Sequence, residues 1–181
     1  MKKRALLVID YTNDFVDGAL PVGEPGKQIE EKLVALTEEA IERGDYVVFA
    51  VDRHEADDPH HPETQLFPPH NLAGSKGREL YGKLKDAYER HQDKKNVVYM
   101  DKTRYSAFAG TDLEIRLRER GIEEVGIVGV CTDICDLHTA IDAYNRGFRI
   151  TVYKDAVASF NPTGHEWALV HMKSCLGARI V

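Results

Sequence analysis

Four ionisable side chains suited to catalysis or metal binding stand at or just past the ends of apolar runs. They are Asp10, Asp52, Lys102 and Cys135. A single ionisable residue at such a point is ordinary. In an open parallel sheet, however, ligands bind outside the carboxyl ends of the strands, where these residues would meet. We therefore expect the four side chains to converge on one edge of a sheet.

Cys135 is the candidate nucleophile. A cysteine is most often a small buried apolar residue, but this one stands at the predicted start of a helix, whose positive dipole end lowers a thiol pKa. A nearby lysine would lower that pKa further, and the thiolate is the reactive form in covalent catalysis. Backbone N–H groups of the turn can bind an oxyanion. We interpret Cys175 as a core residue and give Cys131 a backbone role.

Asp10 and Lys102 could complete such a site. An aspartate at the end of a strand is more often a cap or turn residue. If Asp10 lies against Cys135, its carboxylate can take the thiol proton and return it to a leaving amine. Lys102 would then balance the charge of that pair, although neither residue is specific evidence by itself.

The longest stretch without a strand or helix pattern covers about residues 54–78. Loops of this length are usually functional or disordered. This one holds four of the eight histidines, namely His54, His60, His61 and His70. We therefore favour a functional loop.

Asp52, His54, Glu63 and His70 are the candidate metal ligands. Asp52 and His54 are two residues apart on an extended chain, so both side chains can point the same way. Glu63 and His70 can fold back from the loop, and the neighbouring pair of histidines at 60–61 could replace or assist them. Mixed imidazole and carboxylate ligands suit zinc, iron or manganese. A solvated, histidine-rich loop is an equally good interpretation of this spacing alone.

Three aromatic residues, Phe15, Phe67 and Tyr105, flank these candidates in the sequence. Aromatic residues more often belong to a core, but together these three could sandwich a flat ring. Thr132 and Asp133 precede the candidate nucleophile, and we expect their side chains to cap the helix.

Apolar and amphipathic segments alternate along the chain. The runs predicted as strands are 5–9, 46–51, 97–100, 125–130, 148–153 and 178–181. Periodicity and capping patterns predict helices at about 29–43, 80–88, 111–120, 135–146 and 163–175. This alternation predicts a three-layer α/β/α sandwich with a mainly parallel, Rossmann-like central sheet. No glycine-rich phosphate loop follows a predicted strand, which argues against a dinucleotide-binding protein.

The composition fits one globular domain over residues 1–181. The chain is 43% hydrophobic and 30% charged, and its 24 basic and 30 acidic residues give a net charge of −6. This net negative charge argues against binding to nucleic acid or to anionic membranes. No apolar run approaches the roughly 18 residues of a membrane-spanning helix, and the first run is too short for a signal peptide. Three cysteines without a disulfide pattern predict free thiols and a cytoplasmic protein.

The order and combination of six motif regions are specific. The regions are 8–15, 52–54, 61–63, 67–71, 102–108 and 129–135, which read VIDYTNDF, DRH, HPE, FPPHN, KTRYSAF and GVCTDIC. Over nearly its whole length the chain resembles the nicotinamidases of the isochorismatase-like cysteine hydrolase family. The resemblance implies hydrolysis of nicotinamide to nicotinate and ammonia, in NAD salvage.

The resemblance also implies a catalytic triad of Asp10, Lys102 and Cys135. The thiol would attack the carboxamide carbon, ammonia would leave, and water would hydrolyse the resulting thioester. The implied oxyanion hole consists of the backbone N–H groups of Cys131 and Cys135, with a cis peptide bond between Val130 and Cys131.

A metal ion next to the triad, which takes the pyridine nitrogen of the substrate, is implied as well. Zinc is the first expectation, with iron or manganese as alternatives. The positions that match its protein ligands are Asp52, His54, Glu63 and His70, with water completing the shell. Some relatives place a histidine from the 60–61 region where Glu63 stands. The ring-packing positions are Phe15, Phe67 and Tyr105.

Asp136 departs from the family pattern, which has an apolar residue directly after the nucleophile. If Asp136 faced the site, its charge would raise the thiol pKa and oppose catalysis. It could instead point away and stabilise the start of the helix.

Other functions stay open. They are hydrolysis of another small amide, such as pyrazinamide or an N-carbamoyl compound, and a non-catalytic metal- or ligand-binding role. We expect a small-molecule substrate and a homo-oligomer.

Overall fold

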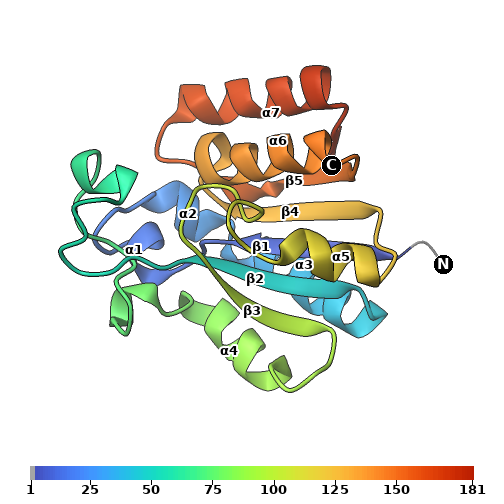
Figure 1. Cartoon of the computed structure of the whole chain (residues 1–181), viewed down its shortest axis with the longest axis horizontal. Helices are drawn as coiled ribbons and strands as arrows, with labels where there is room; N and C mark the ends of the chain where they lie inside the picture. Colours follow the sequence, from blue (N-terminus) through green and yellow to red (C-terminus); the bar gives the residue numbers. More distant parts are fainter. Residues whose placement is uncertain (1–2) are drawn as a thin grey trace.

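The computed structural model describes residues 3–181, and its centre is a six-stranded sheet (Figure 1). The strands are β1 (Arg4–Ile9), β2 (Tyr46–Asp52), β3 (Val97–Lys102), β4 (Glu124–Val130), β5 (Arg149–Ala158) and β6 (Arg179–Ile180). They lie in the order β3-β2-β1-β4-β5-β6, and the pairs among these strands are all parallel. The predicted α/β fold with a mainly parallel sheet is confirmed.

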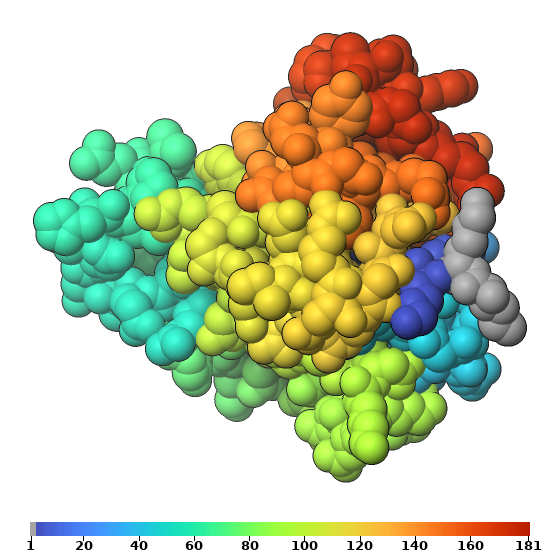
Figure 2. Space-filling model, turned by 45° about the vertical axis from the view of Figure 1, so that its right-hand side comes forward, coloured from blue at the N-terminus to red at the C-terminus, as the bar shows by residue number. Residues whose placement is uncertain are grey.

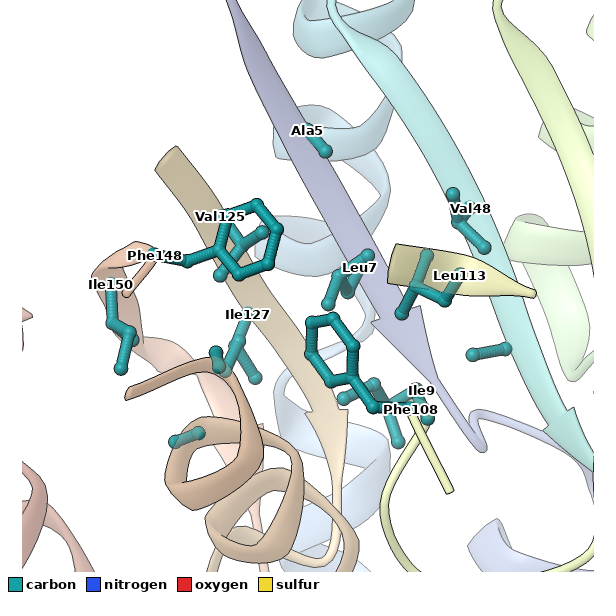
Figure 3. Close-up of a cluster of buried hydrophobic side chains, with 14 of the residues drawn as sticks. Ala5, Leu7, Ile9, Val48, Phe108, Leu113, Val125, Ile127, Phe148 and Ile150 are labelled. Carbon is teal, nitrogen blue, oxygen red and sulfur yellow. The ribbon is translucent and has the colours of Figure 1, made fainter. Parts of the chain in front are cut away.

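Helices cover both faces of the sheet. They are α1 (Asn13–Val16), α2 (Glu24–Gln28), α3 (Glu30–Arg43), α4 (Gly82–His91), α5 (Leu113–Glu119), α6 (Leu137–Asn145) and α7 (Pro162–Leu176). Because successive strand residues point to opposite faces, Leu7 and Ile9 of β1 pack in the core beneath α5, α6 and α7 (Figure 3). Leu6 and Val8 pack in the other core, with α3 and α4. Burial on both faces explains why the strands are almost continuously apolar.

The predicted strands match the observed ones except at β5. This strand continues to Ala158, beyond the predicted end at 153, and passes through the exposed residues Lys154 and Asp155. Its outer neighbour β6 has two residues, so part of β5 is free of a neighbouring strand on that side, and polar residues are tolerated there. The short helices α1 and α2 were not predicted, because four or five residues give too little periodicity.

Two predicted helix caps are wrong. The sequence Thr111–Glu114 is typical of a capping box, but α5 begins at Leu113, after Asp112, which forms no capping hydrogen bond. The hydroxyl group of Thr111 accepts the backbone N–H of Leu113 at 3.3 Å instead. After β4, a π-helical turn (Thr132–Asp136) precedes α6. The hydroxyl group of Thr132 bonds His165 Nδ1 at 2.8 Å, and Asp133 accepts from Ser159 at 2.6 Å. Both side chains fasten the turn to the segment around α7 instead of capping it.

The segment of residues 54–78 is a long irregular loop, as predicted, with two short 3-10 turns, Pro62–Gln65 and Lys76–Arg78. A parallel bridge joins His54 to Leu72 and so returns the loop to the end of β2. In Figure 2 the teal surface of this part of the chain projects from the body of the molecule. Among residues 3–181, no helix is long and apolar enough to cross a membrane.

Candidate active site

The side chain of Lys102 lies fully buried between two carboxylates and a thiol. Its Nζ atom is 2.7 Å from Asp10 Oδ2, 2.5 Å from Asp52 Oδ1 and 3.7 Å from Cys135 Sγ. The ammonium group also donates to the carbonyl oxygen of Arg104 at 3.1 Å. The structure thus brings the four residues from the strand ends together at the carboxyl edge of the sheet.

The end of β1 is shaped so that Asp10 turns into this cluster. Asp10 has a φ of 52°, in the left-handed region that few non-glycine residues adopt. Its Oδ1 atom accepts the backbone N–H of Asp52 at 2.7 Å. Across from it, Gly129 of β4 has a φ of 127°, and a Cβ atom there would lie 2.0 Å from the carbonyl oxygen of Ile9. This glycine therefore allows β4 to pass close to the end of β1.

The resting form of Cys135 is the neutral thiol. Burial raises the thiol pKa well above its usual value, and the ammonium of Lys102 opposes this shift without cancelling it. The expectation of a lowered pKa is wrong, because the sequence did not reveal that Cys135 is 4% exposed. Burial, together with the charge of Asp52, raises the pKa of Asp10 to about 6. Asp10 is therefore a base whose strength suits proton transfer near neutral pH.

Lys102 stays a cation in spite of its surroundings. Burial lowers the pKa of its ammonium group, but the carboxylates of Asp10 and Asp52 outweigh this and hold the pKa well above normal. Burial likewise raises the pKa of Asp52, while Lys102 and His54 lower it below its usual value overall. The centre of the site is thus one fixed positive charge with a permanent carboxylate on one side and a titratable one on the other.

In the turn that carries Cys135, the backbone N–H of Cys135 does not donate to the nearby carbonyl oxygen of Cys131. The carbonyl oxygen of Cys131 accepts the N–H groups of Ile134 at 3.0 Å and Asp136 at 3.1 Å, and the N–H of Cys135 between them is not bonded to it. The peptide bond between Val130 and Cys131 is cis, as the family resemblance implied.

Beside the lysine lies a second group of buried side chains, Asp52, His54, Glu63 and His70. Each offers a ligand atom within 4.8 Å of the others, so the group could hold a metal ion. His54 Nε2 is 3.8 Å from Asp52 Oδ2, and His70 Nε2 is 3.4 Å from Glu63 Oε2.

The free lone pairs of this group fit a metal ion. Asp52 Oδ2, His54 Nε2 and His70 Nε2 are buried atoms without a hydrogen-bond partner among residues 3–181. The Nδ1 atom of His70 donates to the carbonyl oxygen of Pro68 at 2.8 Å, so in the neutral ring the lone pair lies on Nε2, which can bind a metal. Such orphaned atoms are rare in a protein interior unless something binds them.

The two histidines that could have replaced Glu63 lie outside the ligand group. The ring of His61 uses both nitrogens, because Nε2 donates to Thr103 at 2.7 Å and Nδ1 accepts the backbone N–H of Glu63 at 3.2 Å. His60 is exposed. His61 thus orients the Glu63 segment.

Asp10, Asp52 and Cys135 also have potential ligand atoms within 4.8 Å of one another. The Nζ atom of Lys102 lies among them, with two contacts shorter than 2.8 Å. The ammonium group of Lys102 fills that space and excludes a metal ion. We therefore assign one group of potential metal ligands to the site, that of Asp52, His54, Glu63 and His70.

A small pocket opens onto both groups. Its wall includes the three aromatic residues expected there and both Cys131 and Cys135. Sequence reasoning missed three further lining residues, Leu20, Ile134 and Phe160. Ile134 could have been found from its place before the nucleophile. Leu20 and Phe160 carry no local signal, since they reach the pocket from an unpredicted turn and from the far end of β5.

The other two cysteines and Asp136 differ in their surroundings. Cys131 is buried against the pocket, whereas Cys175 is exposed on α7, so its assignment to the core is wrong. The side chain of Asp136 neither reaches solvent nor forms a hydrogen bond, because the residue is 0% exposed and both carboxyl oxygens lack a partner among the described residues.

A buried thiol, lysine and carboxylate at the carboxyl edge of a parallel sheet are groups that a cysteine-dependent hydrolase can use. A family model described as the isochorismatase domain matches residues 4–180. The chain belongs to the isochorismatase family.

The chain is similar in sequence and in structure to several known proteins. It is 63% identical over 180 residues, 98% of each chain, to an uncharacterized isochorismatase family protein, PncA, of Bacillus subtilis (strain 168). A crystal structure of nicotinamidase/pyrazinamidase PncA from Bacillus subtilis superimposes with a TM-score of 0.98, 64% identity and 99% coverage of both chains. The pyrazinamidase of Pyrococcus horikoshii in complex with zinc superimposes with a TM-score of 0.86, 33% identity and coverage of 99% of this chain and 98% of that one.

Proposed function

We propose that this chain is a nicotinamidase, which hydrolyses nicotinamide to nicotinate and ammonia in NAD salvage. One observation carries the proposal: Lys102 Nζ lies 2.7 Å from the Asp10 carboxylate and 3.7 Å from Cys135 Sγ, beside four metal-type ligands. A base, a nucleophile and a metal group beside an aromatic pocket suit an amide on a flat nitrogen heterocycle. The similarity to the nicotinamidase/pyrazinamidase of Bacillus subtilis and the pyrazinamidase of Pyrococcus horikoshii supports this substrate class.

The first half of the reaction forms a thioester. Asp10 takes the proton from Cys135 Sγ as the sulfur attacks the carboxamide carbon. The backbone N–H groups of Cys131 and Cys135 stabilise the resulting oxyanion. Asp10 then gives the proton to the amide nitrogen, which leaves as ammonia. Lys102 keeps its positive charge throughout and stabilises the transient thiolate.

The second half regenerates the thiol. Asp10, again a carboxylate, takes a proton from a water molecule as the water oxygen attacks the thioester carbon. The carbon–sulfur bond breaks, the proton on Asp10 passes to Cys135, and the second proton of the water is lost to solvent as the acid leaves as nicotinate. Each turnover therefore consumes one water and leaves the enzyme unchanged. The rings of Phe15, Phe67 and Tyr105 hold the substrate and limit access of further water.

Asp52, His54, Glu63 and His70 would hold one divalent metal ion, for which zinc is our first expectation and iron or manganese the alternatives. The donor set of two imidazoles and two carboxylates supports all three. When bound, the ion supplies a Lewis acid for the pyridine nitrogen of the substrate. Asp52 joins this group to the triad, since its other oxygen contacts Lys102 at 2.5 Å.

We propose a cytoplasmic homo-oligomer that acts on small molecules and does not bind nucleic acid. The three free thiols support a reducing compartment. Trp167 and Val170, which are 54% and 64% exposed on α7, provide apolar surface for a subunit contact. Light scattering at two protein concentrations would measure the mass in solution.

Ammonia release from nicotinamide tests the function, with pyrazinamide assayed in parallel because the Bacillus subtilis structure is named for both activities. We expect release that a chelator suppresses and that added zinc, manganese or iron restores. No release by the folded, metal-loaded protein would contradict the proposal. It would favour another amide substrate or a non-catalytic binding protein.

A further inference from the structure

The carboxyl group of Asp136 is buried near the site without a hydrogen-bond partner or a paired cation among the described residues. It is 0% exposed, and neither oxygen has a hydrogen-bond partner among residues 3–181. Buried polar side chains normally have a partner, and buried carboxylates are normally paired with a cation. Asp136 directly follows Cys135 in the turn, and its own backbone N–H holds that turn closed by donating to Cys131 at 3.1 Å.

We propose that Asp136 is a positioning residue: the turn that carries Cys135 stays closed only while the carboxyl group of Asp136 holds its proton. In the protonated form the side chain is a small neutral group that the interior accepts. In the ionised form it would need a cation or water, and reaching either requires the turn to open. The proposal makes the state of this turn depend on pH.

The nearby charges leave no cation for Asp136. The nearest cation is Lys102, whose ammonium group already contacts two carboxylates, those of Asp10 and Asp52. With both ionised, that cluster carries one positive and two negative charges. A further carboxylate would add a second uncompensated negative charge to the interior.

The elements packed against the turn supply no further buried cation. On α6, His138 is exposed and Asp142 pairs with Arg146 at 2.9 Å. On α7, His165 bonds Thr132, and on β5 the nearest charged residues are exposed. β4 contributes Glu124 at its opposite end, and the turn itself contributes Asp133, another acid. Burial accordingly raises the pKa of Asp136 well above its usual value, and the charges of Asp10 and Asp133 add to the shift.

The sign of the pH dependence follows from proton linkage. An aspartate in the unfolded chain ionises near pH 4, whereas folded Asp136 keeps its proton to a higher pH. At a pH between the unfolded and folded pKa values of Asp136, unfolding releases the proton of this residue. The unfolding equilibrium constant therefore rises tenfold per pH unit because of Asp136. Other groups contribute to the slope as well, but a comparison with Asp136→Asn cancels them.

The test is urea unfolding of the wild type and of Asp136→Asn at pH 5, 6, 7 and 8. As long as folded Asp136 keeps its proton, we expect the ratio of their unfolding constants, wild type over variant, to rise about tenfold per pH unit, which is 1.36 kcal/mol per unit. Asp136→Val should behave in the same way and fold at least as well as the wild type, because it removes the unpaired carboxyl group. A ratio that changes less than about twofold per unit, or an Asp136→Val chain that does not fold, would overturn the proposal.

Asp133→Asn is the matched control on the same turn. Its carboxylate accepts a hydrogen bond from Ser159 at 2.6 Å and is half-buried, so its stability ratio should not rise with pH in this way. An equal rise in this variant would refute the assignment to Asp136.

A second readout rests on the proposed function. The rate of ammonia release by Asp136→Asn relative to the wild type should increase from pH 6 to pH 9, since the wild type loses the closed turn. If neither protein releases ammonia at any pH, the proposed function fails, and the unfolding experiment still decides the role of Asp136. If ammonia is released with a constant ratio, the function stands and the positioning role is refuted.

Discussion

Lys102 is the residue on which both the stability and the chemistry of the site depend. It is buried, and its ammonium group is the shared partner of two carboxylates. The attraction among these groups offsets the loss of their hydration, which is large in a protein interior. Removing the cation alone would leave Asp10 and Asp52 without that compensation.

We predict that Lys102→Met destabilises the fold by about 3–5 kcal/mol, because breaking a buried ion pair leaves an uncompensated charge. Urea unfolding at pH 7 would measure the change. Lys83→Met is the control, since the exposed pair of Lys83 and Glu31 at 3.3 Å should contribute less than about 1 kcal/mol. Equal losses in both variants would show that burial of the pair is not the cause.

Cys135→Ala should abolish turnover and leave the fold intact, because the thiol of Cys135, beside Asp10 and Lys102, is the group that forms the thioester. Circular dichroism would report the fold, and ammonia release the rate. Cys175→Ala, at an exposed position on α7, should keep wild-type activity. A Cys135→Ala rate within about tenfold of the wild type would refute the nucleophile assignment.

At the scale of elements, the path from β4 into the π-helical turn positions Cys135, the proposed nucleophile. The pairing of β4 with β5 is irregular between Ile127 and Gly129, and the chain then enters the turn through the cis peptide bond. A hydrogen bond between Thr132 and His165, and one that Ser159 donates to Asp133, tie the turn to these two residues. The position of Cys135 therefore depends on β1, β5 and α7 as much as on its own helix.

Gly129→Ala should destabilise the chain by about 3 kcal/mol or more, because a Cβ atom would meet the carbonyl oxygen of Ile9 at 2.0 Å. Gly147→Ala separates backbone strain from this collision. Its φ is 75° and nothing lies within 4 Å of the added atom, so we expect a loss of about 1–2 kcal/mol. Thermal or urea unfolding would compare the two, and similar losses would exclude close approach of β4 to β1 as the cause.

At the scale of the whole molecule, the loop of residues 54–78 closes the site by returning to the strand ends. Glu63 and His70 of this loop meet Asp52 and His54 from β2 and the residues after it. A metal ion bound there would join a projecting segment to the sheet. Ligand binding to the native state stabilises it by mass action.

Zinc at about 100 times its dissociation constant should therefore raise the Tm by about 5–10 °C, from a gain of about 2.7 kcal/mol in a chain of this size. Differential scanning calorimetry of chelated and reloaded protein would measure the shift. His54→Ala should lose it, whereas His91→Ala, on α4 away from the ligand group, should keep it. A shift of equal size in His54→Ala would place the metal elsewhere.

The sequence by itself determined the fold class and the residues that follow each strand. Apolar runs that alternate with amphipathic segments require a covered parallel sheet, and the carboxyl ends of such strands share one edge. The convergence of Asp10, Asp52, Lys102 and Cys135 follows from that rule. Local pattern was sufficient here because strand direction and connection length are local properties.

What the tertiary structure alone decided is the environment of each side chain. Burial raises the pKa of Cys135, whereas the helix start and the lysine had suggested a lowered pKa. The carboxyl group of Asp136 lies in the interior without a hydrogen-bond partner among the described residues. Both ring nitrogens of His61 form hydrogen bonds, whereas Glu63 lies in the group that could hold a metal ion. Cys175 is exposed. These properties depend on segments distant in sequence that pack together, because desolvation and the choice of hydrogen-bond partner are set by all the neighbours of a group.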